Sequence, residues 1–148
     1  MTYQPTVILT GLKTLSYEAN VTATRIAQSR GAQEALLVAP GDKVLEAPTS
    51  TIFWAAGDGV VRTPSLGTGI LASITRDRIM KVAPVEEGDY DVGELLEASE
   101  VFLASSIREV QGVAELDGVR FECPGPTTSR IAGLLSEGIQ AELSDNSR

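Results

Sequence analysis

Two charged side chains in this sequence stand where they could do covalent or acid–base chemistry. Lys13 lies in the segment G-L-K-T-L-S-Y, directly after an apolar run and among apolar neighbours. Burial in such surroundings disfavours the ammonium form, which lowers the pKa and makes lysine a usable nucleophile. Glu46 lies in V-L-E-A-P at an expected strand end, where it could face a cationic group in a cleft. A solvent-exposed lysine and an ordinary strand-end carboxylate are the alternatives.

Two further segments offer hydrogen-bond donors suited to a phosphate group. Ser73, Ile74 and Thr75 open an expected helix after a glycine-containing loop. The free N–H groups and the dipole of a helix N-terminus attract anions. Ser105 and Ser106 end an expected buried strand, where their hydroxyls could add contacts. The alternatives are an ordinary helix cap and plain strand-end polarity.

The composition restricts both the chemistry and the partners. The chain has 148 residues, a formal net charge of −8 and no histidine. Its negative field argues against nucleic acid and anionic membranes, because it repels phosphate. With Cys123 as the single cysteine, the sequence offers no plausible zinc site and no intramolecular disulfide. The sequence shows no signal peptide and no apolar run of transmembrane length, so we expect a cytoplasmic protein.

Strands and helices in irregular alternation must position these groups. Apolar runs predict strands at residues 6–10, 34–39, 43–46, 50–55, 60–62 and 101–104, with a turn at 57–59. Residues 110–113 and 119–121 are expected to form a last hairpin around Asp117 and Gly118. The pattern predicts an α/β domain of the mixed α+β kind, not a regular doubly wound sheet.

Helices are predicted from their caps and their apolar spacing. Asn20 is expected to cap a helix that runs to about Arg30 and stops at Gly31. A second helix covers residues 73–83, and Asp91 and Glu94 have capping-box spacing for a short third one. The last helix begins near residues 127–128 and carries an apolar face of Ile131, Leu134, Leu135, Ile139 and Leu143.

Taken in order, four segments resemble the class IV aminotransferase and aminodeoxychorismate lyase family, the fold-type IV pyridoxal-phosphate enzymes. G-L-K-T-L-S-Y resembles the segment around the Schiff-base lysine, and V-L-E-A-P-T-S-T-I-F-W the segment whose glutamate pairs with the pyridine nitrogen. G-I-L-A-S-I-T-R-D resembles the phosphate cup, and E-V-F-L-A-S-S-I-R-E-V the second phosphate-contacting segment. The family usually has glycine at the position of Ser73 and often threonine at that of Ser106. The resemblance covers the chain from Leu12 to Gly118.

This resemblance implies pyridoxal 5'-phosphate as the cofactor and assigns a role to each residue. Lys13 would form the Schiff base and then move a proton, and Glu46 would hold the pyridinium proton. Tyr17 would approach the phenolic oxygen of the cofactor. The phosphate would lie at the turn of residues 73–75, bound by the N–H groups of Ile74 and Thr75 beside Ser73 and by the hydroxyls of Thr75 and Ser106. The resemblance also implies a homodimer and a small amino acid, keto acid or aminodeoxychorismate as substrate.

The chain departs from the family pattern in length and at two positions. Only residues 1–11 precede the lysine motif, whereas family members carry an additional N-terminal domain that supplies a phosphate-binding arginine. We therefore expect residues 1–148 to form one domain, equivalent to the C-terminal domain of the D-amino acid aminotransferase-like fold, with antiparallel-rich strands and flanking helices. Residues 47–50 replace a stretch with glycine and asparagine, and Arg108 replaces a small residue, which bears on the substrate.

Two functions follow from the resemblance. The first is an enzyme, either an aminotransferase or the lyase that releases pyruvate and 4-aminobenzoate, and the lysine and glutamate motifs are more similar to the lyases than to branched-chain transaminases. The second is a non-catalytic half-domain that needs a separate N-terminal chain to form an active site. A structural domain without cofactor would require the match of four segments to be chance.

Overall fold

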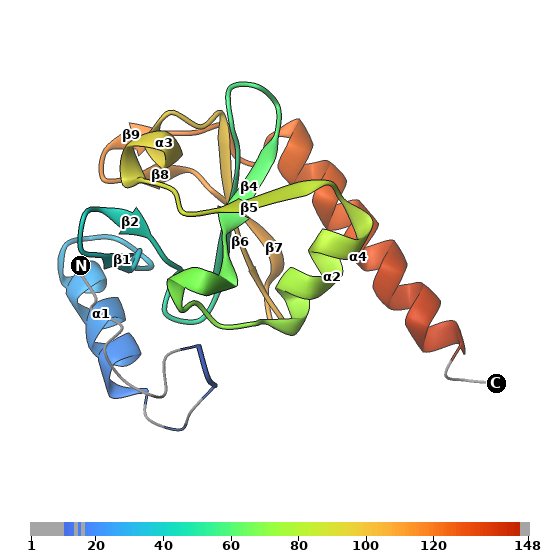
Figure 1. Cartoon of the computed structure of the whole chain (residues 1–148), viewed down its shortest axis with the longest axis horizontal. Helices are drawn as coiled ribbons and strands as arrows, with labels where there is room; N and C mark the ends of the chain where they lie inside the picture. The colour runs from blue at the N-terminus through green and yellow to red at the C-terminus, as the bar shows by residue number, and fades with distance from the viewer. Residues whose placement is uncertain (1–10, 14, 16, 146–148) are drawn as a thin grey trace.

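A five-stranded sheet lies at the centre of the computed structural model, which describes residues 11–13, 15 and 17–145 (Figure 1). The strand order is β5-β4-β3-β6-β7. The strands are β3 (Thr51–Ala55), β4 (Val61–Pro64), β5 (Val85–Gly88), β6 (Glu100–Ser105) and β7 (Glu109–Val113). All neighbours pair antiparallel except β4 and β5, which are parallel. The mixed, antiparallel-rich architecture with flanking helices is therefore confirmed; the strand predicted at residues 6–10 lies outside the described residues.

Four helices and two small ladders surround this sheet. The helices are α1 (Glu18–Ser29), α2 (Ile74–Val82), α3 (Val92–Leu96) and α4 (Pro126–Asp145), with a 3-10 turn η1 (Leu66–Thr68) before α2. One ladder joins β1 (Val38–Ala39) to β2 (Lys43–Val44), and the other joins β8 (Glu115–Leu116) to β9 (Val119–Arg120). In Figure 1, α2 and α4 lie together beside the sheet, while α1 lies near the β1–β2 ladder. No helix among the described residues is both long and apolar enough to cross a membrane.

The sheet is buried on both faces, because alternate residues of β3 and β6 enter two different apolar clusters. Phe53 and Phe102 stack with ring centroids 5.2 Å apart and pack with the apolar face of α2 and α4. Trp54 enters the other cluster, whose members come from β2, β6 and α3, and meets Tyr90 edge to face at 5.1 Å. The two central strands are continuous apolar runs in the sequence because neither face of the sheet meets water there.

Several local signals act as the sequence predicted. Gly31 ends α1 in the left-handed region, with φ +85°. The capping box of α3 is formed, with the Asp91 N–H donating to the Glu94 carboxylate at 3.3 Å. The apolar face of α4 is buried at Ile131 and Leu135, although its last member, Leu143, is 57% exposed.

Other predictions were wrong in detail. Asn20 does not cap α1, which begins at Glu18; its Nδ2 instead donates to the carbonyl of Pro48 at 2.5 Å. The strand expected at 34–39 is reduced to β1.

The expected last hairpin is also rearranged. Residues 109–113 pair with β6 in the main sheet, and the turn at Asp117 and Gly118 joins β8 to β9. The edge strand β5 was missed because its sequence, V-E-E-G, is half charged, and only its parallel pairing with β4 makes it a strand.

Candidate cofactor-binding site

The first part of the site is a lysine–tyrosine pair where the chain enters α1. Lys13 Nζ donates to Tyr17 Oη at 3.0 Å and lies 5.5 Å from the centroid of the Tyr17 ring. Gly11 has φ +79°, and a Cβ added to it would lie 3.5 Å from the carbonyl of Ile70. The loop that carries Lys13 therefore starts against the segment that leads to α2.

Of the two alternatives for Lys13, burial among apolar neighbours and exposure to solvent, the structure shows exposure. Lys13 is exposed, and its apolar neighbours Leu12 and Leu15 are 62% and 102% exposed. These leucines face outward, so they do not remove water from the ammonium group. The apolar residues around Lys13 therefore form exposed surface that another segment could cover. They do not bury Lys13 in the core of this chain.

The second part is Glu46, a half-buried carboxyl group two residues after β2. One of its oxygens accepts a hydrogen bond from the N–H of Leu71 at 3.2 Å. Burial raises the pKa of Glu46 from 4.5 to about 7, and the hydrogen bond from Leu71 offsets only part of this effect. Among the described residues, no lysine or arginine pairs with Glu46. The structure thus places a carboxylate where it would gain from a cationic neighbour.

The third part is the N-terminal turn of α2. Ser73 is the N-cap residue, and its hydroxyl accepts the N–H of Arg76 at 3.1 Å. The N–H groups of Ile74 and Thr75 precede the first possible intrahelical bond, so they have no acceptor within the helix. The Thr75 hydroxyl lies 3.4 Å from the Ser106 hydroxyl, which stands just after β6. Two backbone N–H groups without an acceptor in the helix thus stand beside two hydroxyls that share a hydrogen bond, an arrangement that suits an anion at a helix N-terminus.

A single segment, residues 71–75, links the carboxyl group to this turn. The Leu71 N–H contacts Glu46, the Leu71 carbonyl accepts the Ser73 N–H at 2.8 Å, and Thr75 meets Ser106. Sequence reasoning missed Leu71 because its contribution comes from the backbone, which carries no side-chain signal.

Not every predicted residue takes part in a contact. Ile74 exposes 69% of its surface, so only its backbone can contribute to an anion site. The described contacts group the predicted residues as Lys13 with Tyr17, Glu46 with Leu71, and Thr75 with Ser106. They do not join these three groups in one hydrogen-bonded network.

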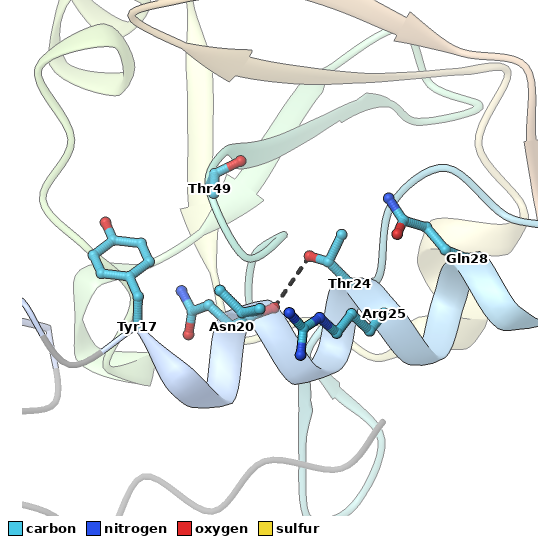
Figure 2. A pocket seen from close by; sticks show the side chains of 7 residues that line it. Tyr17, Asn20, Thr24, Arg25, Gln28 and Thr49 are labelled. Carbon is cyan, nitrogen blue, oxygen red and sulfur yellow. Dashed lines mark hydrogen bonds between the residues drawn. The ribbon is translucent and has the colours of Figure 1, made fainter.

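An open groove of about 240 Å³ runs from Tyr17 along the face of α1 that is turned toward the loop carrying Thr49 (Figure 2). Asn20, Thr24 and Gln28 line it, and Thr49 stands on the opposite side. Asn20 ties α1 to the loop that follows Glu46 through its bond to Pro48. This loop begins with the substituted stretch at residues 47–50, so that stretch and α1 form one wall beside the lysine.

Known proteins resemble this chain over most of its length. The sequence model of the Amino-transferase class IV family matches residues 2–116. The D-alanine aminotransferase of Listeria monocytogenes serotype 4b is 35% identical over 135 residues, which are 86% of this chain and 46% of the relative. The aminodeoxychorismate lyase of Bacillus subtilis is 29% identical over 135 residues, 87% of this chain and 46% of the relative. The chain therefore spans about half the length of these curated relatives.

The fold is shared with solved structures of the same kind. A branched-chain amino acid aminotransferase from Thermobaculum terrenum, in its PLP form, superposes with a TM-score of 0.86 at 30% identity. The match covers 93% of this chain and 47% of that one.

Proposed function

The chain belongs to the class IV aminotransferase family, and from this we propose that it forms the cofactor-binding part of an aminotransferase or aminodeoxychorismate lyase. The observation that carries the proposal is the arrangement along residues 71–75, where the Leu71 N–H meets the half-buried Glu46 carboxyl group and the Thr75 hydroxyl meets that of Ser106. Gly11, two residues before the exposed Lys13, lies close to the carbonyl of Ile70, directly before this segment. We propose a small amino acid, keto acid or aminodeoxychorismate as substrate.

The residues present fit pyridoxal 5'-phosphate, the cofactor of this family. When bound, it supplies a ring that takes up electrons from the bonds of an attached amino group. The turn of Ile74 and Thr75, with the hydroxyl of Ser106, would hold the phosphate, since the net charge of −8 attracts no anion by itself. Glu46 would face the ring nitrogen, because a carboxylate without a cation is stabilised by a protonated pyridine.

Lys13 is the residue proposed to attach the cofactor and afterwards to move a proton. Its Nζ is the atom that gives up and takes back the proton, and the Tyr17 hydroxyl at 3.0 Å orients that atom. Tyr17 is also proposed to lie beside the phenolic oxygen of the cofactor. Both roles need an amine that is reachable from outside, as Lys13 is in this chain.

We further propose that a second polypeptide segment completes the site. Large apolar side chains stand exposed around it, on the lysine loop, on η1, at the start of α2 and after β6: Leu12, Leu15, Leu66, Ile74 and Ile107. Apolar surface of this kind favours association. A homodimer, or an N-terminal domain on the same or a separate chain, would cover it. By itself the chain would then be a cofactor-binding half-domain without turnover.

Borohydride reduction followed by peptide mapping tests the attachment site. After incubation with pyridoxal 5'-phosphate, the reduced adduct is expected on Lys13 in preference to Lys43 and Lys81, the other lysines of the chain. Lys43 pairs with Asp91 at 3.0 Å and Lys81 pairs with Asp77 at 2.7 Å. Because Lys81 is also 70% exposed, it serves as the reference for unspecific reaction. Lys13→Met should abolish the adduct and Lys81→Met should leave it unchanged. Equal labelling of Lys13 and Lys81 would refute the assignment.

Product analysis separates the two enzyme classes. Once the site is complete, a transaminase converts more than one equivalent of an amino donor to its keto acid only when an acceptor is present. The lyase releases pyruvate and 4-aminobenzoate from aminodeoxychorismate without an acceptor. Turnover of neither kind by a chain that binds the cofactor would favour the non-catalytic half-domain.

A further inference from the structure

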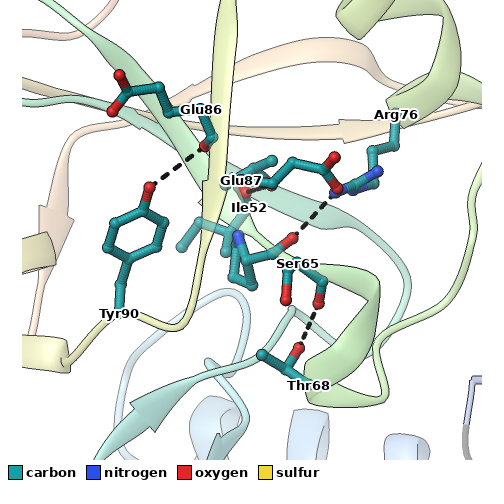
Figure 3. Close-up of polar contacts among 9 residues, drawn as sticks. Ile52, Ser65, Thr68, Arg76, Glu86, Glu87 and Tyr90 are labelled. Atoms are coloured by element: carbon teal, nitrogen blue, oxygen red, sulfur yellow. Dashed lines mark hydrogen bonds and ion pairs between the residues drawn. The ribbon is translucent and has the colours of Figure 1, made fainter.

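A buried arginine follows the donor turn directly and points away from it. Arg76 is the third residue of α2, and its side chain is only 6% exposed. The guanidinium donates to the carbonyl of Pro64 at 3.0 Å and forms an ion pair with Glu87 (Figure 3). Pro64 ends β4 and Glu87 belongs to β5, so Arg76 connects the start of α2 to two strands of the sheet.

Burying this guanidinium is costly. Removing a charged group from water is unfavourable unless partners satisfy it, and a buried ion pair often adds little net stability. The Glu87 side chain is still 39% exposed, and the Arg76 Nε has no hydrogen-bond partner among the described residues. Stability alone is therefore a weak explanation for the arrangement, whereas in some proteins buried ionic groups fix a geometry.

These contacts of Arg76, called the anchor below, act at the N-terminal end of α2, which carries the N–H groups of Ile74 and Thr75. The apolar contacts of α2 with the core come from its second half, through Ile79 and from Ala83 just beyond it. The first turn instead has the Ser73 cap and the Arg76 side chain. Apart from the guanidinium, the turn with Ile74 and Thr75 meets the sheet through the buried Thr75, whose hydroxyl lies 3.4 Å from that of Ser106.

We propose that Arg76 and Glu87 are positioning residues for the phosphate-binding turn. They fix the N–H groups of Ile74 and Thr75 against Ser106 before the ligand arrives, so that binding does not have to order the turn. This inference rests on the proposed function for its ligand, because the turn is there assigned to the cofactor phosphate. Its structural half, the fixing of the turn, stands on the contacts of Arg76 alone.

Binding of pyridoxal 5'-phosphate compared with pyridoxal tests the role toward the phosphate. Arg76→Met should lower the affinity for pyridoxal 5'-phosphate at least about tenfold and change the affinity for pyridoxal little. Arg76→Lys should recover part of the lost affinity. Free pyridoxal partly closes to a ring, but this lowers its apparent affinity equally for parent and variant, so the effect cancels in their ratio. Arg78→Met is the matched control: Arg78 lies on the same helix and pairs with Glu142 on α4, away from the turn. It should leave both affinities unchanged.

Glu87→Gln separates positioning from plain electrostatics. This variant removes a negative charge, so a purely electrostatic role of the region predicts tighter phosphate binding. Positioning predicts weaker binding, because Arg76 loses its ion-pair partner. Tighter or unchanged binding in Glu87→Gln would overturn the proposal, as would an equal loss for both ligands in Arg76→Met.

Amide hydrogen exchange without any ligand keeps the inference distinct from the proposed function. The Asp77 N–H donates to the Ser73 carbonyl at 3.0 Å at the start of α2, and the Ala83 N–H donates to the Ile79 carbonyl at 2.9 Å at its end. In Arg76→Met and Glu87→Gln, exchange at Asp77 should accelerate at least about tenfold while Ala83 stays unchanged. Unchanged exchange at Asp77, or equal acceleration at both amides, refutes the positioning role. If the parent binds no cofactor although Asp77 responds as expected, the proposed function fails and the anchor remains.

Discussion

Glu46→Gln should stabilise the cofactor-free chain at alkaline pH, although it removes a residue of the proposed site. Burial raises the pKa of Glu46 from 4.5 to about 7, partly offset by the Leu71 N–H. Between these two pH values the folded state holds a proton that the unfolded state has lost. The free energy of unfolding therefore falls as the pH rises through this window. At pH 8 the loss amounts to about 3 kcal/mol, at 1.36 kcal/mol for each pH unit between the two values.

Glutamine resembles the protonated acid, since it is neutral and keeps an oxygen that can accept the Leu71 N–H. Urea denaturation should therefore show Glu46→Gln to be more stable than the parent by up to about 3 kcal/mol at pH 8, and nearly equal to it at pH 4. The exposed Glu97 provides the control, because Glu97→Gln should give the same small difference at both pH values. Saturating pyridoxal 5'-phosphate should stabilise the parent more than Glu46→Gln, since only the carboxylate can pair with a protonated ring nitrogen. A variant that is no more stable than the parent at pH 8 would refute the reasoning.

Three other predictions concern the donor turn, the long helix and the assembly. Thr75→Pro removes one backbone N–H and the hydroxyl, while the fixed φ of proline suits a first helical turn, so cofactor affinity should fall far more than the free energy of unfolding. Thr75→Ser should change both quantities little. Equal cofactor affinity of Thr75→Pro and the parent would place the phosphate elsewhere. Glu100, 2% exposed, accepts the N–H groups of Thr127 and Thr128 at 2.9 and 2.8 Å; burial favours its neutral form, but these bonds outweigh burial and lower its pKa. Glu100→Gln should thus lower the free energy of unfolding, measured by urea denaturation, by about 2 kcal/mol at pH 7, and by less as the pH falls below 4.5. An equal loss at pH 3 would argue against an ionised carboxylate at this helix N-terminus. Light scattering at low micromolar concentration should show a species larger than a monomer, because Leu15 and Ile107 are 102% and 94% exposed; a clean monomer would contradict the proposed association.

Much of the fold is determined by chemistry that is local in the sequence. The apolar runs of β3 and β6 and the helical spacing of α2 and α4 indicate burial directly, because each element hides a continuous surface. Gly31 and the Asp91–Glu94 pair mark helix ends through contacts within a few residues. The expected strand at 34–39 and the last hairpin were misjudged although their partners are near in the sequence: β1 pairs only residues 38–39 with 43–44, and residues 109–113 pair with the preceding strand β6. Which nearby segment a strand pairs with depends on side-chain packing, which the strand pattern alone does not show.

The site divides in the same way. Lys13, Glu46, Thr75 and Ser106 are recognisable from four motifs in order, since the chemistry of each depends on its side-chain type. What the tertiary structure decided is how they are held. The Leu71 N–H that contacts Glu46 has no side-chain signature, and the 3.4 Å approach of Thr75 to Ser106 joins residues on different elements. Arg76 shows the difference most clearly: its sequence position suggests an ordinary helix-surface arginine, whereas in the fold its side chain is buried and meets Pro64 at the end of β4 and Glu87 in β5. The sequence specifies which groups are present, whereas their burial, and with it their charge and rigidity, depends on segments that meet only in the folded chain.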